Sequence, residues 1–121
     1  MKTKLQTYND GTISLYRRKM EDLTVNRNIT SLEELDFIIT LAYSETSRRQ
    51  QDMEFAEQNS FSLSEKVKTP RPPADKGLDS QCFAVIGNTL YGVRYIDTAQ
   101  RELYFYLEKV RELKGNSNGT K

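Results

Sequence analysis

Three carboxylates lie close together in the sequence, at Glu33, Glu34 and Asp36. Paired carboxylates can exchange protons with a substrate or hold a divalent cation. Their spacing matches no cation-binding loop, because the glycine that gives such a loop its sharp turn is missing. We therefore expect a solvated acidic face here, not a catalytic or metal site.

The chain has no histidine and one cysteine, Cys82. Without an imidazole it has no nucleophile–histidine pair and no histidine ligand for a metal. One thiol forms no internal disulfide and no thiolate cluster, and the phosphate loops Gly-x-Gly-x-x-Gly and Gly-Lys-Ser/Thr are missing. These absences predict a protein that is not an enzyme, with no cofactor and no metal. Cys82 is expected to be a small buried apolar residue.

Four tyrosines lie on two segments near the C-terminus, at Tyr91, Tyr95, Tyr104 and Tyr106. On regular strands, Tyr91 and Tyr95 share one face, and Tyr104 and Tyr106 share one face of the next strand. Such a group of rings is able to stack nucleobases, as in single-strand-binding barrels. The alternative is a sheet face packed under a helix or against another subunit, where tyrosine is common.

The charge is spread unevenly, although the net charge is only +1. Residues 1–20 hold five basic residues and one acidic residue, a net charge of +4, and residues 21–60 hold three basic and nine acidic residues, a net charge of −6. The small total argues against a strongly basic nucleic-acid binder. Opposite patches attract between copies of a chain, and the alternative is that they are ordinary solvated faces. The candidates for such an interface are the four tyrosines and, in addition, six charged residues: Glu33, Glu34, Asp36, Arg17, Arg18 and Lys19.

The size and composition fit one small domain over residues 1–121. The length is 121 residues, and hydrophobic residues make up 36% of them, which leaves a small core and little room for a deep cavity. No apolar run approaches the roughly 20 residues of a membrane span, and no apolar segment follows Lys2 and Lys4 as in a signal peptide. We expect a protein that stays in a reducing cytoplasm and does not contact a membrane.

Alternation of apolar and polar residues predicts five or six strands. Phe37, Ile38 and Ile39 follow one another, so their strand is expected to be buried on both faces. Gly87-Asn88 is expected to be a two-residue hairpin turn, and Ser31 begins a capping-box pattern for one helical turn. The predicted strands cover residues 12–19, 36–43, 61–68, 82–86, 89–96 and 103–110, with a polar loop at 20–31.

One segment favours a helix and one excludes regular structure. Residues of about 45–58 are good helix formers with a narrow apolar stripe at Met53, Phe55 and Ala56, which predicts a surface helix lying on a sheet. Residues of about 68–80 contain all three prolines and form a long loop. The ordered core is expected over 10–112, with a flexible tail at 114–121. The predicted fold is mainly β: a small antiparallel β-barrel or sandwich of five to six strands with one surface α-helix and a long Pro-rich loop.

The order of these elements resembles a known family. Leu41-Ala42-Tyr43 ends a strand, a polar Arg/Glu-rich helix covers 47–56, and a strand and the long loop follow. The sequence then reads Val-Ile-Gly-Asn-Thr-Leu-Tyr-Gly-Val-Arg-Tyr-Ile-Asp over 85–97, with Arg101 and a hydrophobic last strand after it. This layout, over about residues 10–112, resembles the small head-tail joining proteins of long-tailed bacteriophages, also called head closure or stopper proteins. In that family the hairpin Ile-x-Gly-x-x-Tyr-x-Ile, followed by Asp and a closing strand, is typical.

The resemblance implies a structural virion protein at the head-tail interface, made in the host cytoplasm during assembly. It implies a β-barrel with a helix, in a ring of twelve copies that closes the DNA-filled capsid, docks the tail and opens for DNA ejection. The implied partners are its own copies, a portal-side adaptor protein, a tail terminator or tail-completion protein, and the packaged double-stranded DNA in the channel.

Such a ring suggests a role for the basic residues in or beside the Pro-rich loop. Lys66, Lys68, Arg71 and Lys76 are expected to face the channel near the DNA phosphates, where many copies sum to a strong local field. The alternative is an ordinary exposed loop. Two other functions stay open, a tail-completion or terminator ring and a small single-stranded nucleic-acid-binding β-barrel that uses the four tyrosines.

Overall fold

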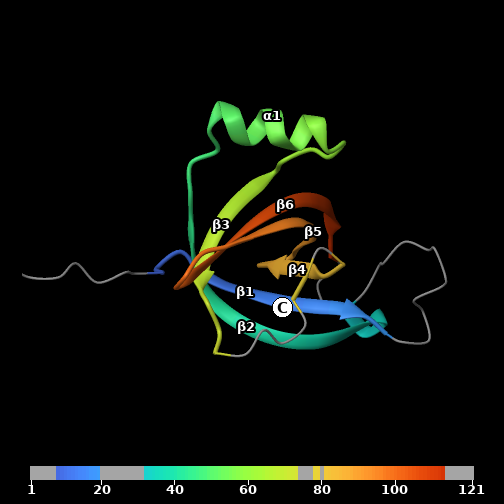
Figure 1. The fold of residues 1–121 in the computed structure, drawn as a ribbon. Helices are drawn as coiled ribbons and strands as arrows, with labels where there is room; N and C mark the ends of the chain where they lie inside the picture. Colours follow the sequence, from blue (N-terminus) through green and yellow to red (C-terminus); the bar gives the residue numbers. More distant parts are fainter. Residues whose placement is uncertain (1–7, 20–31, 74–77, 80, 114–121) are drawn as a thin grey trace, which may run out of the picture.

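The computed structural model describes residues 8–19, 32–73, 78–79 and 81–113. Within them, six antiparallel strands form one sheet that closes on itself in the order β1-β2-β3-β6-β5-β4, with one α-helix outside it (Figure 1). The elements are β1 (Gly11–Arg18), η2 (Leu32–Glu34), β2 (Leu35–Glu45), α1 (Gln50–Gln58), β3 (Glu65–Pro70), β4 (Phe83–Ile86), β5 (Thr89–Thr98) and β6 (Glu102–Glu112). The predicted mainly-β fold with one surface helix is confirmed. Of the two predicted arrangements, the single closed sheet is like a barrel, because a sandwich would consist of two separate sheets.

Apolar side chains from every strand fill the inside of the closed sheet. The largest fully buried ones include Ile13, Leu15, Phe105 and Leu107, each 0% exposed. Two smaller apolar clusters lie on the outer face. One contains Leu35, Val85 and Leu90, and α1 covers the other, which contains Ala56, Leu63 and Tyr106. Part of the outer face is therefore buried, under α1 and beside Leu32 of η2.

The C-terminal meander agrees with the sequence prediction. Ile86 lies opposite Thr89, so Gly87 and Asn88 form a two-residue hairpin loop between β4 and β5. Gly87 adopts a positive φ of 61°, a backbone conformation that residues with a Cβ rarely adopt. β5 and β6 then pair along almost their whole length.

The prediction that the second strand is buried on both faces is wrong. Phe37 is 58% exposed, and Thr40 is also exposed. A closed single sheet gives each strand one inner and one outer face, and the outer face of β2 meets solvent. The pairing of β1 with β2 shifts after Leu15, which lies opposite Ile39, while Tyr16 lies opposite Phe37. Ile38 is the extra residue of this bulge.

The third strand and the helix begin later than predicted. The strand begins at Glu65 and not at residue 61, because Leu63 is buried in the cluster under α1 instead of pairing in the sheet. The helix begins at Gln50 and not at residue 45. Glu45 is the last residue of β2, and the Thr46 amide extends its pairing by donating to the Lys66 carbonyl at 2.9 Å.

The predicted loop at 20–31 and tail at 114–121 lie outside the described residues, as does Lys76. β3 extends to Pro70, so the Pro-rich connection starts at Arg71, whose amide donates to the Arg101 carbonyl at 3.0 Å. Pro72 is buried. Across residues 8–19, 32–73, 78–79 and 81–113, no helix is long and apolar enough to cross a membrane.

Replacing Gly87 with alanine tests the hairpin turn. A Cβ at Gly87 meets nothing within 4 Å, so the cost comes from the positive φ alone, and we expect a loss of about 1 kcal/mol in the free energy of unfolding. Gly92→Ala is the matched control, because its Cβ meets only the Arg94 side chain at 3.7 Å and its φ is unstrained. Urea unfolding measures both. A loss at Gly92 equal to that at Gly87 contradicts this account.

Candidate interaction surface around helix α1

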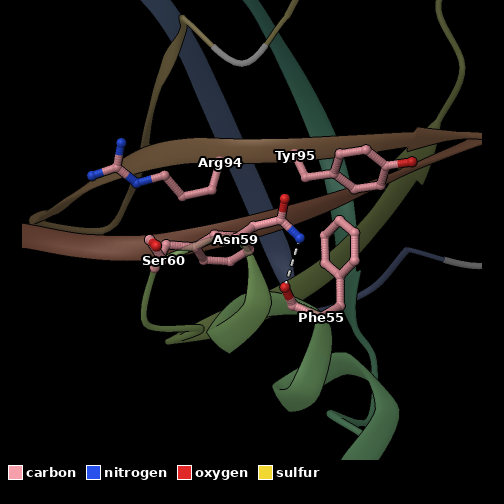
Figure 2. A pocket seen from close by; sticks show the side chains of 6 residues that line it. Phe55, Asn59, Ser60, Arg94 and Tyr95 are labelled. Atoms are coloured by element: carbon pink, nitrogen blue, oxygen red, sulfur yellow. Dashed lines mark hydrogen bonds between the residues drawn. The ribbon is translucent and has the colours of Figure 1, made fainter.

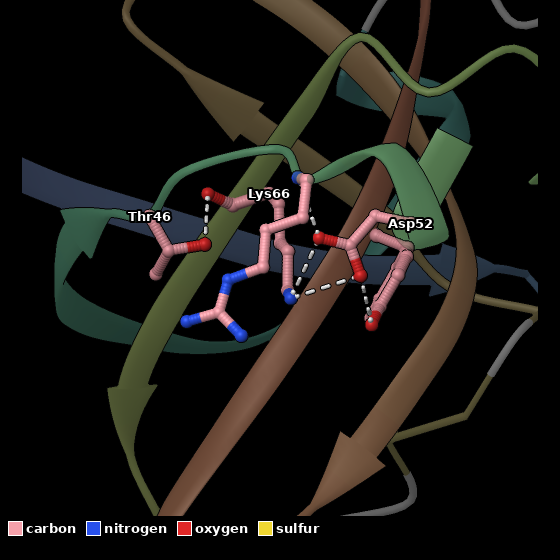
Figure 3. Close-up of polar contacts among 5 residues, drawn as sticks. Thr46, Asp52 and Lys66 are labelled. Carbon is pink, nitrogen blue, oxygen red and sulfur yellow. Dashed lines mark hydrogen bonds and ion pairs between the residues drawn. The ribbon is translucent and has the colours of Figure 1, made fainter. Parts of the chain in front are cut away.

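A buried carboxylate attaches α1 to the sheet. Asp52, in the first turn of the helix, is 6% exposed. Its oxygens accept hydrogen bonds from the Arg49 amide at 2.9 Å, from the Lys66 ammonium at 3.1 and 3.2 Å, and from the Tyr106 hydroxyl at 3.2 Å (Figure 3). The helix is thus linked to β3 through Lys66 and to β6 through Tyr106.

The Lys66 ammonium is enclosed as well as paired. Its nitrogen lies 5.1 Å from the centre of the Tyr106 ring and 5.7 Å from that of Tyr104. The rings replace part of the water lost on burial, because a cation is attracted to an aromatic face. A buried ion pair with this many additional partners specifies a geometry, although removing one partner leaves the other charge buried alone.

The pKa values follow from these contacts. Burial works to raise the pKa of Asp52, but the hydrogen bonds from Arg49, Lys66 and Tyr106 outweigh it and hold the pKa below its usual value. The stabilisation is therefore present above the unfolded-state value and is lost as the pH falls through the folded-state pKa. Burial, together with the Asp52 charge and its hydrogen bond, raises the pKa of Tyr106 to about 12.

The sequence predicted a different buried face for the helix. Met53 was expected in the apolar stripe, but it is 44% exposed. The buried positions are Asp52 and Ala56, four residues apart, with Phe55 half-buried beside them. Aspartate at a buried helical position has no apolar signature, so the hydrophobic pattern points to the wrong stripe.

An open pocket lies where the end of α1 meets β5. Its volume is about 300 Å³, at the lower end of the roughly 300–1,000 Å³ of small-molecule sites. We call it the seam pocket, and its lining residues are Phe55, Asn59, Ser60, Phe61, Arg94 and Tyr95 (Figure 2).

Packed aromatic rings form the wall of the seam pocket. Phe55 contacts Tyr95, Tyr106 and Phe61 with ring centres 4.9, 5.6 and 6.2 Å apart. The Asn59 side chain is fixed by its donation to the Phe55 carbonyl at 2.8 Å. Ser60 follows with a φ of 64°, an uncommon value for a residue other than glycine. The pocket is preformed and has room for one or two side chains.

A bulge in β5 changes the predicted arrangement of the tyrosines. Val93 lies opposite Leu107, but Tyr95 lies opposite Tyr106, so Arg94 is the extra residue. Tyr95 therefore reaches the outer face, whereas Tyr91 packs against the inner core. The prediction that Tyr91 and Tyr95 share a face is wrong because it assumed unbroken alternation.

Tyr104 and Tyr106 do share the outer face as predicted, since both pack in the cluster under α1. Tyr106 is 7% exposed and Tyr104 is half-buried. Of the four tyrosines only Tyr95, at 41%, is strongly exposed. The four rings therefore form no shared stacking platform, and the alternative of a face packed under a helix fits Tyr104 and Tyr106.

The four basic residues predicted for the channel loop are not all in a loop. Lys66 lies beside the loop, within β3, and its ammonium pairs with the buried Asp52 carboxylate at 3.1 Å. Lys68 is also in β3, and its side chain, 26% exposed, lies 3.9 Å from Glu102. Arg71 is exposed at the start of the connection and donates to the Ala99 carbonyl at 3.2 Å.

The predicted acidic and basic interface residues meet within one chain. Arg17 lies opposite Asp36 in the β1–β2 pairing, and Lys19 is 3.9 Å from Asp36. The Arg18 guanidinium lies 5.3 Å from the Phe83 ring. At this end of the sheet, the described basic residues of β1 therefore lie among the acidic residues of β2 and do not form a separate patch. Glu33 and Glu34 lie next to it, in η2.

Cys82 is 2% exposed, and burial raises the pKa of its thiol, which confirms the predicted buried apolar role. Across the described ranges, no group of three or more His, Cys, Asp or Glu side chains is placed to hold a metal ion. No family model matches the chain, and no curated protein matches its sequence.

Replacing Asp52 with alanine tests the attachment of the helix. The Lys66 ammonium then stays buried without its counterion, so we expect a loss of about 3 kcal/mol in the free energy of unfolding at neutral pH. Glu54→Ala is the matched control on the exposed side of α1, where Glu54 accepts a hydrogen bond from the Gln50 side chain at 3.2 Å, and should cost under about 0.5 kcal/mol. Urea unfolding compares them, and similar losses in the two variants argue against the role of Asp52.

Alkaline pH tests the Tyr106 hydroxyl. Its folded-state pKa of about 12 exceeds the unfolded value of roughly 10, so the folded state keeps a proton that the unfolded chain loses. The contribution of Tyr106 to the free energy of unfolding is thus fully present below pH 10. It should decrease between pH 10 and 12, by roughly 1 kcal/mol per pH unit for one such group. Tyr8, which donates to Glu102 at 2.7 Å and whose pKa is also raised to about 12, adds a similar slope. In urea unfolding across this range, Tyr106→Phe and Tyr8→Phe should each reduce the slope; unchanged slopes would refute the assignment.

Proposed function

We propose that this protein is a structural virion component at the head-tail interface of a long-tailed bacteriophage. In this role, copies of the chain form a ring that closes the DNA-filled capsid below the portal-side adaptor and presents a docking surface to the tail. The observation that carries the proposal is the order of elements. Two paired strands, an outer helix, a third strand, a Pro-containing connection and a closing meander follow one another as the resemblance implies.

The chemistry of the described side chains supports a role in assembly. The most buried charged cluster, Asp52 with Lys66, fixes a helix against a sheet and lies beneath two tyrosine rings. The seam pocket at the other end of α1 is small, open and walled by aromatic rings, as in a surface that receives a side chain of another protein. A ring component needs such preformed contact surfaces on a rigid body.

The basic residues at the start of the Pro-rich connection supply the proposed contact with DNA. Lys68 and Arg71 lie at the end of β3 and just after it, and Lys76 follows further along the chain. In a ring, these cations from all copies would face one channel, and their combined field would act on phosphates even though a single chain is almost neutral.

Binding to capsids tests the proposal. The purified chain is mixed with DNA-filled, tailless capsids, and the bound fraction and the DNA retained after a salt challenge are measured. We expect the chain to bind and to increase DNA retention. A variant with Lys68, Arg71 and Lys76 changed to serine should bind as well as the native chain but retain less DNA, because it keeps the fold and loses the channel charge.

Three outcomes would overturn the proposal or one of its parts. A chain that ignores capsids but binds short single-stranded oligonucleotides as a monomer at moderate salt is a nucleic-acid-binding barrel. A chain that binds isolated tails instead of capsids is a tail-completion ring. Equal DNA retention by the native chain and the serine variant rejects only the role of the loop cations.

A further inference from the structure

A second open pocket lies at the beginning of α1, where the segment between β2 and the helix meets the outer face of β3 and β6. Its volume is about 360 Å³. Three of its lining side chains are cations, Arg49 directly before the helix and Lys66 and Lys68 on β3. One lining side chain is a carboxylate, Asp97 on β5. We call this the basic pocket, because its wall carries more cations than carboxylates.

Two further carboxylates lie behind the lysines and hold them in place. Asp52, which is buried, accepts hydrogen bonds from the Lys66 ammonium at 3.1 and 3.2 Å (Figure 3). Glu102, with 13% of its side chain exposed, lies 3.9 Å from the Lys68 ammonium. Neither carboxylate lines the pocket. They weaken the positive field there, but they also fix the two lysines in position, so these side chains lose less freedom when a ligand binds.

The one lining carboxylate lies across the pocket from the cations. In the sheet, Lys68 lies opposite Tyr104 on β6, and Tyr104 lies opposite Asp97 on β5. Because paired strands are about 4.8 Å apart, roughly 10 Å separates the backbone of Lys68 from that of Asp97. Arg49 lies on the side of the lysines, since its amide and the Lys66 ammonium both donate to Asp52. An anion held between α1 and β3 therefore contacts the cations and avoids Asp97.

We propose that the basic pocket binds a phosphate group through Arg49, Lys66 and Lys68. Arg49 is exposed and forms no ion pair within the described ranges, so its guanidinium is able to donate to two phosphate oxygens at once. The exposed Ser47 hydroxyl on the same wall is a neutral donor for a third oxygen. The phosphate is a backbone phosphate of the double-stranded DNA, so this inference rests on the proposed function and adds Arg49 and a defined pocket to the proposed contact.

Two other surface pockets of similar size suit an anion less well. The seam pocket has one lining cation, Arg94, which is already paired with Glu108 at 2.8 Å. A pocket of about 350 Å³ between the start of the Pro-rich connection and β5 is lined by one cation and one carboxylate, Arg71 and Asp79. Of these three, only the basic pocket brings several cations from two separate segments to one place, which allows a phosphate to be held from more than one side.

Titration with inorganic phosphate, followed by the NMR shifts of the backbone amides, tests the pocket directly. Phosphate should shift the signals of residues 46–49 and 66–68, and acetate at the same ionic strength should shift them much less. The double variant Arg49→Gln, Lys68→Gln should bind phosphate at least roughly tenfold more weakly, because it loses two charge-assisted contacts. Arg48→Gln is the matched control, since it removes the same charge from the neighbouring exposed position outside the pocket, and it should bind phosphate like the native chain.

Asp97→Asn should change the affinity in the opposite direction. It removes the one carboxylate that lines the pocket, so phosphate should bind roughly threefold more tightly. A variant that has lost its structure does not gain affinity, and thermal unfolding of every variant checks that it is folded. An affinity that stays the same or decreases in the folded Asp97→Asn variant contradicts binding between these charges.

A short labelled DNA duplex identifies the source of the phosphate. The affinity of the native chain should decrease as the salt concentration rises. The double variant should reduce the slope of log affinity against log salt by about 1, equally for duplexes of different sequence, because one phosphate contact is lost. Phosphate binding without binding to the duplex would reject DNA as the source and leave a site for free phosphate.

Three results overturn the phosphate pocket: no shifts at these amides, equal shifts with acetate, or equal weakening in Arg48→Gln and the double variant. Capsid binding separates this failure from a failure of the proposed function. A native chain that binds capsids but not phosphate keeps the function and loses the pocket. A native chain that binds phosphate but ignores capsids keeps the pocket and loses the function.

Discussion

The position of α1 depends on one buried carboxylate. A helix of nine residues is too short to be stable alone in water, and its buried face offers only Ala56 and part of Phe55 as apolar contacts. Asp52 supplies the rest, because it accepts hydrogen bonds from its own helix, from Lys66 on β3 and from Tyr106 on β6. Hydrogen bonds are directional, so these contacts fix the rotation of the helix where an apolar stripe would allow sliding.

The aromatic wall of the seam pocket follows from this attachment. Tyr106 donates to Asp52 and also packs against Phe55 and Tyr95. The ring that completes the polar cluster is thus also a support for the pocket. A shift of the helix would separate Phe55 from both tyrosines, so the shape of the pocket and the buried ion pair are coupled through one side chain.

The sequence was sufficient where the structure follows local rules. The β4–β5–β6 meander was predictable because alternation and the Gly87-Asn88 turn are local signals. The start of α1 was not, because it depends on Thr46 pairing with a carbonyl 20 residues away. The role of Asp52 depends on partners 14 and 54 residues away, and no spacing in the helix itself indicates them.

The bulges at Ile38 and Arg94 explain why the predicted faces of Phe37 and Tyr95 were wrong. Without the extra residue Ile38, Phe37 would point into the interior of the closed sheet. Without the extra residue Arg94, Tyr95 would point into this interior as well. Each bulge reverses the alternation once and turns an aromatic ring outward. Inside a closed sheet of this size, the two rings would compete with Leu15 and Phe105 for space. Turning them outward relieves that crowding and at the same time gives two opposite sides of the molecule different aromatic surfaces, which is the asymmetry that a head-to-tail assembly requires.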